Sequence, residues 1–549
     1  MQRRPLLILV AAAVLSTGSS VPLTQARPDG PAVAPRAASA PAPAAPAAAG
    51  PAAARPAVAT RHPVHSATRV TSTPAPGVTL TSLTYGTRDA DDYWTVQVNL
   101  PRQPDGPLTG APLALGPHDT ALRVAKALGA AGFRPRVERV TTPAYADRPA
   151  GVLGWTVRTR RYADEAAATA LVARLKTAGF TARTRYTAQD GGDEDAPQRV
   201  HVLRVDLDVF GGRLAADHGP ALKGTEKLTD LIGASGAVAG INGQWFYNSA
   251  PGGMYVRDGR ILGSATRGRA GVRLDRGGRS LAVDTFTTRV TVTAGGETAE
   301  VDGINRLPGE VWNCGGVGGD QPTERPQHDF KCTDASELVR FTPEWGAPPA
   351  GAGAEAVLDA RGRVTAVHTS RGAAVPAGGS TLQATGDSAA WLLRTVRAGA
   401  VLSFDERIGD GQGRAVALGP DTTILQVGPS LVRAGRVAVN AVGDGIVREG
   451  PDQSFTYEWT VRANPRSMIG RDGEGRLLLV VADGRNPGVS EGLSIDGAAR
   501  LMRSLGAREA LNLDGGGSSV LATAAGVVNR PSDTAGQRSL GNALLLLPR

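Results

Sequence analysis

Two apolar runs near the C-terminal end of the chain predict buried strands. The first covers residues 477–482, is apolar at every position and ends abruptly in Asp483-Gly484-Arg485. The second covers residues 510–513 and ends in Asp514, which three glycines follow. Short runs of this kind, apolar on both faces, are typical of strands in the interior of a sheet.

The segment between the two runs predicts a helix. Ser494 is a suitable N-cap, and Gly506 is placed to end the helix. The apolar face that this helix would bury consists of Ile495, Ala498, Leu501, Met502 and Leu505. A strand–helix–strand unit strongly favours parallel strands joined by a right-handed crossover. Both strands would then end at one edge of the sheet, with Asp483 and Asp514 about 5 Å apart at the backbone if the strands are neighbours.

A repeated pattern predicts a smaller unit nearer the N-terminus. Ala-Gly-Phe occurs at residues 131–133 and again at 178–180. Each copy follows an amphipathic helical segment and, further upstream, a strand-like run at 93–100 or 154–160, and another strand follows each copy. Two strand–helix–strand units predict a four-stranded sheet with two helices on one of its faces.

From residue 199 onward the pattern changes to many short apolar runs separated by glycine turns. This pattern predicts a larger, strand-rich α+β domain over residues 199–549, and the α+β class for the chain as a whole. At 549 residues the chain is long enough for more than one domain.

The N-terminal residues 1–26 have the pattern of a secretory signal peptide. Arg3-Arg4 precedes an apolar core that is too short to span a membrane, and small residues lead up to Ala26. The sequence is compatible with export by either the Sec or the twin-arginine route. Ala and Pro dominate residues 27–77, which predicts a disordered linker and a small domain over 78–190. No later segment is suited to a membrane anchor, so we expect a secreted protein associated with the cell wall.

Net charge and cysteine content indicate which ligands and which redox environment suit the protein. The net charge is +9, the arginines are scattered, and no nucleic-acid-binding module is recognisable. This balance suits anionic wall polymers or phosphate-bearing glycans. The two cysteines of the chain, Cys314 and Cys332, are close in sequence and predict one disulfide in an exported protein, with two free thiols as the alternative.

Two motifs in the predicted small domain point to a known family. They are Trp94-Thr95-Val96-Gln97-Val98 and the repeated Leu-x-x-x-Gly-Phe element. On these motifs the segment resembles the SPOR (sporulation-related repeat) domain from residue 93 to residue 188. The resemblance implies binding of peptidoglycan glycan strands through the exposed face of the sheet. A ferredoxin-like domain without a ligand is the alternative.

A series of short elements occurs in order through the C-terminal region, each weak alone and specific as a set. They are Ile241-Asn242-Gly243-Gln244-Trp245-Phe246, Gly303-Ile304-Asn305-Arg306, Gly428-Pro429-Ser430-Leu431-Val432, Pro465-Arg466-Ser467-Met468-Ile469-Gly470, Asp483-Gly484-Arg485, Ser490-x-Gly492, Asn512-Leu513-Asp514-Gly515-Gly516-Gly517-Ser518-Ser519, Asn529-x-Pro531 and Arg538-x3-Asn542. On this set most of residues 199–548 resemble the phosphodiester glycosidase family. Gln244 stands where the family has glycine, and Ser467-Met468 where it has Thr-Ala, which puts the substrate fit in doubt.

The resemblance implies hydrolysis of the glycosidic bond of a sugar-1-phosphodiester, of the N-acetylglucosamine-1-phosphate type, in a wall or capsular glycopolymer. Such a reaction normally uses two carboxyl groups, for which Asp514 and Asp483 are the candidates. The candidates for substrate binding are Asn242, Asn305, Arg466, Arg485, Gly515, Gly516, Gly517 and Ser518. Guanidinium groups can bind phosphate through two donors, amides suit sugar hydroxyls, and successive glycines let backbone N–H groups turn toward an anion.

Simpler interpretations of the same residues stay open. Turn residues, structural ion pairs and buried amides would account for the two aspartates, the two arginines and the two asparagines. Gly488-Val489-Ser490-Glu491-Gly492 matches the serine-hydrolase elbow, but the last histidine is His368, so a triad in that chain order is excluded.

Cofactors are not fixed by the sequence. The dispersed histidines give no zinc pattern, whereas Asp483 and Asp514 could hold a divalent cation, Ca²⁺ or Mg²⁺. Two alternatives to a glycosidase follow: a non-enzymatic protein that binds wall glycan, and a metal-dependent phosphodiesterase that cuts the other P–O bond.

Overall fold

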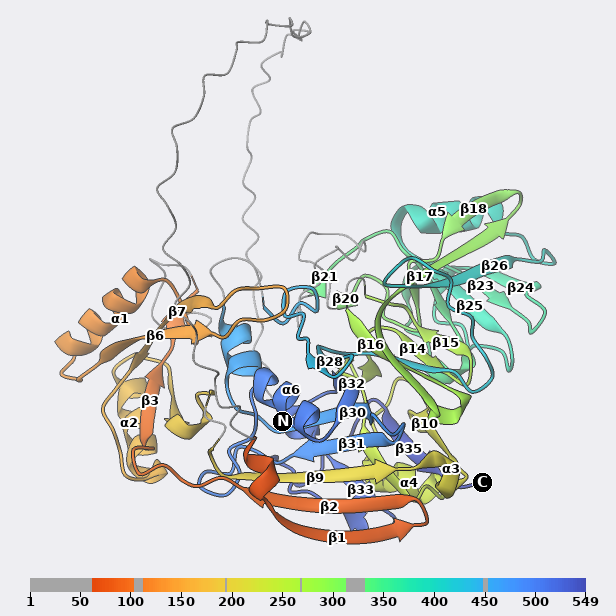
Figure 1. Ribbon diagram of the computed structural model, residues 1–549. Helices are drawn as coiled ribbons and strands as arrows, with labels where there is room; N and C mark the ends of the chain where they lie inside the picture. The colour runs from red at the N-terminus through yellow and green to blue at the C-terminus, as the bar shows by residue number, and fades with distance from the viewer. Residues whose placement is uncertain (1–61, 103–111, 193–194, 267–268, 313–330, 448–452) are drawn as a thin grey trace, which may run out of the picture. The chain divides into compact units, whose positions relative to one another are not determined.

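The computed structural model describes residues 62–102, 112–192, 195–266, 269–312, 331–447 and 453–549. The fold is strand-rich α+β, as predicted (Figure 1). Within the described residues, no helix is long and apolar enough to cross a membrane. The predicted signal peptide and the linker up to residue 61 lie outside the described residues, as does Cys314.

The most extensive sheet among the described residues joins segments from both ends of the chain. All neighbouring strands in it are antiparallel. In spatial order they are β1 (Thr68–Ala75), β2 (Val78–Tyr85), β9 (Gln198–Val205), β31 (Leu477–Ala482), β30 (Arg466–Asp472), β32 (Ala507–Asn512), β28 (Ser430–Arg433) and β29 (Arg436–Val437). β31 is buried at every position, which explains its unbroken apolar sequence.

The two predicted strands are parallel but are not neighbours. β31 and β32 each pair antiparallel with β30, which lies between them. Their ends are therefore two strand spacings apart, about 10 Å rather than 5 Å. The connecting helix α6 (Ile495–Ser504) begins where the sequence predicted, because the Ser494 hydroxyl accepts a hydrogen bond from the Gly497 N–H at 3.0 Å.

A second sheet shares a hydrophobic core with the first. Its strands, in spatial order, are β10 (Arg213–Asp217), β35 (Ala543–Leu547), β11 (Ala239–Asn242), β33 (Leu521–Thr523) and β34 (Gly526–Val527). Ile241 and Leu544 from this sheet and Leu479 and Leu511 from the first belong to one buried cluster. Packing of these two faces brings the end of β11 next to the end of β32.

Two further sheets complete the larger part of the molecule. One contains β15 (Arg260–Gly263), β14 (Tyr255–Arg257), β27 (Thr423–Gln426), β16 (Ala270–Asp275), β17 (Ser280–Ala294), β18 (Glu297–Glu300) and β26 (Ser403–Asp410). The other contains β19 (Gly303–Ile304), β22 (Leu338–Phe341), β25 (Ser380–Ala384), β23 (Gly351–Leu358) and β24 (Val364–Arg371), with helix α5 (Gly386–Thr395) packed on β23. The helices α3 (Leu207–Phe210) and α4 (Leu228–Ser235) are short.

The small domain has the arrangement that its repeat predicted. Its sheet has the order β6 (Arg136–Thr142), β7 (Gly151–Arg158), β3 (Trp94–Val98) and β8 (Ala182–Tyr186). Helices α1 (His118–Ala130) and α2 (Glu165–Thr177) bury their apolar sides against this sheet (Figure 1). β3 is central because it pairs with both β7 and β8, which leaves β8 at an edge.

The boundaries drawn from the sequence differ from those of the structure. Residues 68–75, assigned to the linker, and 78–85, assigned to the small domain, form the hairpin β1–β2, and β2 pairs with β9. Both strands therefore belong to the larger part of the molecule. β1 lies at the edge of its sheet and is exposed along most of its length, so it lacks the apolar alternation that would reveal a strand.

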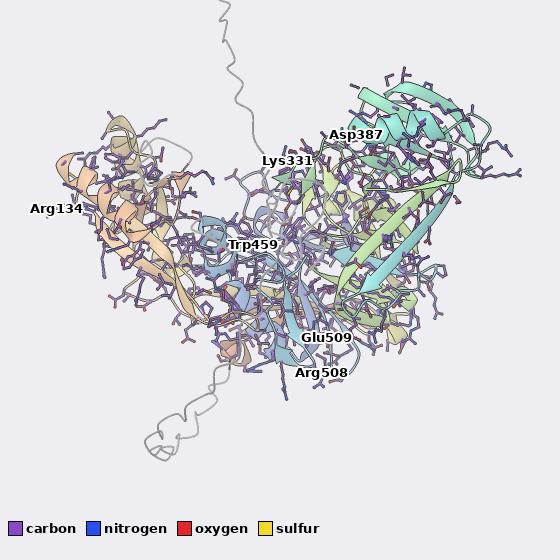
Figure 2. All side chains as sticks on the ribbon, turned by 90° about the horizontal axis from the view of Figure 1, so that it is seen from above. Arg134, Lys331, Asp387, Trp459, Arg508 and Glu509 are labelled. Atoms are coloured by element: carbon purple, nitrogen blue, oxygen red, sulfur yellow. The ribbon has the colours of Figure 1, made fainter. Side chains whose placement is uncertain are left out.

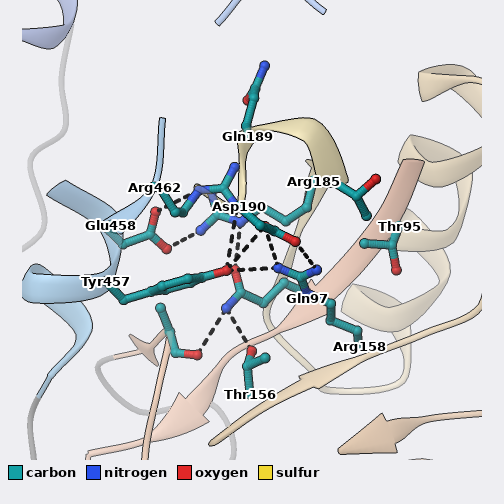
Figure 3. A network of polar contacts seen from close by, with 12 residues as sticks. Thr95, Gln97, Thr156, Arg158, Arg185, Gln189, Asp190, Tyr457, Glu458 and Arg462 are labelled. Carbon is teal, nitrogen blue, oxygen red and sulfur yellow. Dashed lines mark hydrogen bonds and ion pairs between the residues drawn. The ribbon is translucent and has the colours of Figure 1, made fainter. Parts of the chain in front are cut away.

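The sheet face of the small domain that turns away from its helices packs against a π-helical turn, Thr456–Val461 (Figure 3). Arg158 on β7 contacts both carboxylate oxygens of Asp190, at 2.5 and 2.7 Å, and the Tyr457 hydroxyl at 2.8 Å. Arg462, just after the turn, reaches Asp190 at 2.6 Å. The part of this face around Arg158 is therefore covered by protein, whereas Arg183 on the edge strand β8 stays 44% exposed.

Candidate active site

The loop that follows β32 is fixed by the end of β11. The Asn242 side-chain amide donates to the main-chain oxygen of Asp514 at 2.8 Å, and the Asp514 N–H donates to Gly243 O at 3.0 Å. The Asn242 amide oxygen accepts from the Ser467 hydroxyl at 2.6 Å and from the Val520 N–H at 3.1 Å. Asn242 has no solvent exposure, so it positions the loop and does not face a ligand directly.

Two of the three glycine N–H groups after Asp514, which the sequence suggested as a backbone anion site, are engaged within the protein. The Gly515 N–H donates to the Asp514 carboxylate at 2.8 Å, and the Gly516 N–H donates to Pro465 O at 2.9 Å. Hydroxyl groups are the donors that stay open here. The Oγ atoms of Ser518 and Ser519 are both buried and have no hydrogen-bond partner among the described residues.

Three guanidinium groups lie against the three glycines, and each meets a different one. A Cβ atom added at Gly515 would lie 3.9 Å from Arg466 Nη1, and one added at Gly516 would lie 3.1 Å from Arg485 Nη2. A Cβ at Gly517 would collide with the Arg538 guanidinium. A side chain at Gly517 would displace the Arg538 guanidinium and one at Gly516 would crowd Arg485, whereas Gly515 meets Arg466 at an ordinary contact distance. We refer to Gly515–Gly517 with Arg466, Arg485 and Arg538 as the glycine–arginine loop.

Arg466 is a buried cation at the base of this loop. Its Nε donates to Leu493 O at 2.8 Å, its Nη2 donates to Trp459 O, and its Nη1 has no hydrogen-bond partner among the described residues. Burial, reinforced by the neighbouring Arg485, lowers the pKa of Arg466 to about 9. A nearby anion would offset this cost, because it would favour the charged form.

Arg485 is exposed at the surface of the loop. It donates to the Asn464 amide oxygen from Nη2 at 2.9 Å and from Nε at 3.2 Å. Burial of the guanidinium lowers the pKa of Arg485, an effect that Asp533 opposes. Its φ of +57° lies in the left-handed region that side chains rarely adopt. Strain of this kind is common at functional sites.

Arg538 is held in place by Asp533. Its Nε and Nη2 lie 2.9 and 3.2 Å from the two carboxylate oxygens of Asp533. This fork-to-fork geometry fixes the guanidinium next to Gly517. Asp533 also places a second carboxylate against Gly517.

Asp483 is buried beneath the glycine–arginine loop and does not reach its surface. One of its carboxylate oxygens accepts from the Asn529 amide at 3.2 Å and from the Arg530 N–H at 3.0 Å. The other oxygen lies 3.5 Å from Nε2 of His201. Asp483 is only 4% exposed, so its carboxylate holds the segment after β34 against the end of β31.

Asn305 is also outside the glycine–arginine loop. It lines a cavity of about 90 Å³ together with Tyr247 and Trp312. Its amide nitrogen donates to Leu262 O at 3.1 Å, and its amide oxygen accepts from the Thr342 N–H at 2.9 Å. These bonds indicate a structural amide, which agrees with the simpler interpretation of the sequence.

Aromatic side chains stand beside the buried cation. The Arg466 guanidinium lies 4.9 Å from the ring centroid of Trp459, which contacts Trp245 edge to face at 5.7 Å and Phe455 in a stacked arrangement at 5.8 Å. Flat apolar rings next to cations suit a ligand that has both a sugar ring and a phosphate.

The described residues give the metal prediction no support, whereas Cys332 is not a free thiol, in keeping with the disulfide prediction. No group of three or more His, Cys, Asp or Glu side chains among them could hold a metal ion. The Asp483 carboxylate accepts N–H donors, so Asp483 and Asp514 do not fit a shared cation. Cys332 is 3% exposed, and the disulfide with Cys314 stays a prediction because Cys314 lies outside the described residues.

Comparison with known proteins gives the family. The model of the phosphodiester glycosidase family matches residues 352–547, which include the glycine–arginine loop. Residues 352–547 are a domain of the phosphodiester glycosidase family. The crystal structure of a candidate exported protein of Burkholderia pseudomallei K96243 shares 32% identity with the present protein, covers 88% of this chain and 96% of its own, and superposes with a TM-score of 0.77.

More distant structures also align with this chain. A hypothetical protein from Synechocystis is 17% identical, with 88% of this chain and 76% of that one covered and a TM-score of 0.49. The catalytic domain of zebrafish N-acetylglucosamine-1-phosphodiester alpha-N-acetylglucosaminidase, auto-inhibited by its pro-peptide, is 12% identical, with 83% and 89% covered and a TM-score of 0.28. None of the curated proteins matches the chain significantly.

Sequence reasoning left several residues out of the site. Arg538 had been noted only as part of a motif, and Asp533 and Asn464 had not been singled out. Of these residues, Arg538 alone could have been identified from the sequence, through its place in the Arg538-x3-Asn542 element. The others meet the loop through tertiary contacts that no local pattern reveals.

Proposed function

We propose that this protein hydrolyses the glycosidic bond of a sugar-1-phosphodiester. The observation that carries the proposal is the glycine–arginine loop beside Asp514, in which three guanidinium groups converge on three glycines. Arg485 and Arg538 donate from Nε and Nη2 to Asn464 and Asp533, which leaves the Nη1 group of each to donate to a phosphate oxygen. The buried charge of Arg466 adds to the positive potential at the same place.

The chemistry follows from the position of the charges. Cleavage of the bond between the anomeric carbon and the phosphodiester oxygen builds positive charge on the sugar and negative charge on the leaving phosphate. The Asp514 carboxylate would stabilise the first, and the arginines the second. Water supplies the oxygen that joins the anomeric carbon, and the phosphomonoester leaves with the bridging oxygen. A phosphate stabilised in this way needs no strong general acid.

Asp483 has a different part in this proposal from the one that the sequence suggested. Its carboxylate is occupied by Asn529 and Arg530, so it acts as a positioning residue beneath the loop. Asp533 is the other carboxylate beside the glycines, but it is paired with Arg538. Asp514 is therefore the residue to which we assign the role at the anomeric carbon.

The setting that we propose is the outside of a bacterial cell. The N-terminal pattern of a signal peptide supports export, and the name of the Burkholderia relative points in the same direction. The substrate would be a phosphodiester-linked wall or capsular glycan. Binding of peptidoglycan or another wall glycan by the small domain is part of the proposal, although not through the sheet face that Tyr457 and Arg462 cover.

The test is product analysis with a small diester of N-acetylglucosamine-1-phosphate. We expect the protein without residues 1–26 to release free sugar and a phosphomonoester, and Asp514→Asn to release neither. Release of sugar-1-phosphate would show the metal-dependent phosphodiesterase instead, and a chelator would then abolish it. Retention on wall glycan with no turnover of any diester would show a binding protein.

A further inference from the structure

A groove runs along the free edge of the small domain and reaches the glycine–arginine loop. Its volume is about 530 Å³, within the usual range for ligand sites. One wall is the edge strand β8, with Arg183 and Arg185, and the other is the segment around the π-helical turn, with Phe455 and Trp459. Arg485 stands at its inner end. We call this feature the edge groove.

The charge of the edge groove favours an anionic ligand. Four arginines and two glutamates line it. One glutamate, Glu458, accepts an ion pair from Arg185 and lies 3.9 Å from Arg183, whose side chain is 44% exposed. Burial lowers the pKa of Arg185 to about 10, so the side chain still carries its charge at neutral pH. The net charge of the lining is therefore positive.

The aromatic residues of the edge groove suit sugar rings. Trp94 lies at the small-domain end, in contact with Tyr186 at 5.3 Å between ring centroids. Phe455 and Trp459 stack at an interplanar angle of 14°, so that they form one apolar strip toward Arg485. Aromatic faces separated by arginines are typical of sites for a chain that alternates apolar sugar faces with negative groups.

The two walls of the edge groove are held in a fixed relation. The buried contacts of Asp190 with Arg158 and Arg462 join the small-domain sheet to the π-helical turn (Figure 3). Gln97 receives a hydrogen bond from Arg185 at 2.6 Å, which ties a groove residue into the same network. Rigid walls reduce the entropy cost of ligand binding.

We propose that the edge groove binds an anionic glycan chain, namely the part of the substrate that lies beyond the scissile phosphate. This inference rests on the proposed function and names the substrate class as a polymer rather than a small diester. The terminal sugar-1-phosphate occupies the glycine–arginine loop, and the chain that carries the phosphate continues past Arg485 along β8. The small domain thus completes the substrate site instead of acting as a separate anchor.

The test compares a polymer with a small substrate. The probes are an N-acetylglucosamine-1-phosphate polymer and the methyl diester of the same sugar phosphate. In the Arg183→Glu variant we expect the ratio of kcat/KM for the polymer to kcat/KM for the methyl diester to fall about fivefold to tenfold. Added salt should shrink that difference, because the groove contacts are partly exposed.

The matched control is Arg134→Glu. Arg134 is exposed at the outer end of the small domain, away from Trp459 (Figure 2). The Arg134→Glu substitution changes the charge by the same amount as Arg183→Glu, but outside the edge groove. If both variants lowered the ratio equally, the groove inference would be wrong and the effect would be one of net charge.

Binding measured without turnover separates this inference from the proposed function. Titration calorimetry of the Asp514→Asn protein with the polymer reports binding at the loop and the groove without cleavage, and a second substitution in the groove isolates the contribution of the groove. Weaker polymer binding by Asp514→Asn/Arg183→Glu, with no loss of binding by Asp514→Asn/Arg134→Glu, would support the groove inference. This conclusion would hold even if the parent protein cleaved neither probe, a result that would contradict only the proposed function. Equal polymer binding by both double variants would overturn the groove while leaving hydrolysis of the methyl diester intact.

Discussion

The side-chain amide of Asn242 donates a hydrogen bond to the main-chain oxygen of Asp514, at 2.8 Å. This bond joins the ends of two strands from different sheets, β11 and β32, that are far apart in the sequence. The same amide accepts from the Ser467 hydroxyl on β30, so three strands converge on one buried side chain. The position of Asp514 is therefore set by the packing of two sheets and not by its own loop.

The first prediction separates the two aspartates. Asp514→Asn should lower kcat for a sugar-1-phosphodiester by about 10³-fold, because the carboxylate charge is lost at the reacting carbon. Stability should change little, because an amide oxygen can still accept the Gly515 N–H. Asp483→Asn should lower stability by about 1–3 kcal/mol, through its bonds to Asn529 and Arg530, and kcat by less than tenfold. Urea unfolding together with steady-state kinetics checks both variants. The assignment fails if the two kinetic effects are reversed.

The second prediction concerns the strained backbone of Arg485. Replacement by glycine removes both the guanidinium and the cost of a side chain at φ +57°. We expect Arg485→Gly to be as stable as the parent, or up to about 1 kcal/mol more stable. Its kcat/KM should fall roughly thirtyfold, the loss expected for a charge-assisted phosphate contact of about 2 kcal/mol. Thermal unfolding and diester hydrolysis measure the two effects separately.

Arg485→Ala is the control for that prediction. It removes the same guanidinium but keeps the strain, so its activity should match that of Arg485→Gly and its stability should be lower. A glycine variant less stable than the alanine variant would show that the conformation of Arg485 is not strained in the folded protein.

The sequence predicted much of the core of the larger part of the molecule and less of its site. The unbroken apolar run of β31 and the Ser494 cap were readable because burial and capping leave local patterns. The insertion of β30 between β31 and β32 was not, because β30 comes from an upstream segment and pairing partners leave no local mark. Asp483 and Asp514 share a sheet edge as predicted, yet one intervening strand is enough to give them different surroundings.

The arginines illustrate the same limit within the site. The spacing of Arg485 after β31 made it a candidate, and it does lie against Gly516. Its neighbour Arg538 comes from beyond β34, and it is placed by its ion pair with Asp533. The run of three glycines was the strongest sequence signal of the site. In the structure these glycines allow arginine side chains to approach closely.

The third prediction concerns the contact between the small domain and the π-helical turn. Asp190 holds Arg158 and Arg462, both of which are 4% exposed. Burial opposes ionisation of all three groups. Even so, Arg158 and Arg462 lower the pKa of the Asp190 carboxyl, and Asp190 together with Tyr457 raises the pKa of Arg158 and that of Arg462. Asp190→Asn would leave two buried cations with only their longer contacts, 3.4 Å from Arg158 to Glu138 and 3.9 Å from Arg462 to Glu458, which should lower stability by about 3 kcal/mol.

An exposed ion pair provides the comparison for Asp190. Asp405 lies 2.7 Å from Arg407, and both side chains are more than half exposed. Asp405→Asn should change stability by less than about 1 kcal/mol. Denaturant unfolding measures both variants. Equal effects would show that the Asp190 contact contributes no more than a surface pair does.

The last prediction is a pH dependence that originates at Asp444. This residue is 1% exposed, and its carboxylate oxygens accept from the N–H groups of Ala270 at 2.5 Å and Ser430 at 3.2 Å. Burial, only partly opposed by those hydrogen bonds, raises the pKa of Asp444 from its ordinary value of 3.8 to about 6. The folded protein thus keeps a proton on Asp444 at pH values where the unfolded chain has released it.

The sign of the effect follows from proton binding. Between about pH 4 and pH 6 the unfolded chain binds fewer protons at this position than the folded protein, so stability contributed by Asp444 falls as the pH rises. The loss should be on the order of 3 kcal/mol. Asp444→Asn mimics the protonated acid at every pH, so its stability relative to the parent should rise by that amount from pH 4 to pH 7. Urea unfolding of both proteins across this range removes the contributions of all other groups by difference. Two parallel curves would mean that Asp444 ionises in the folded protein as readily as in the unfolded chain.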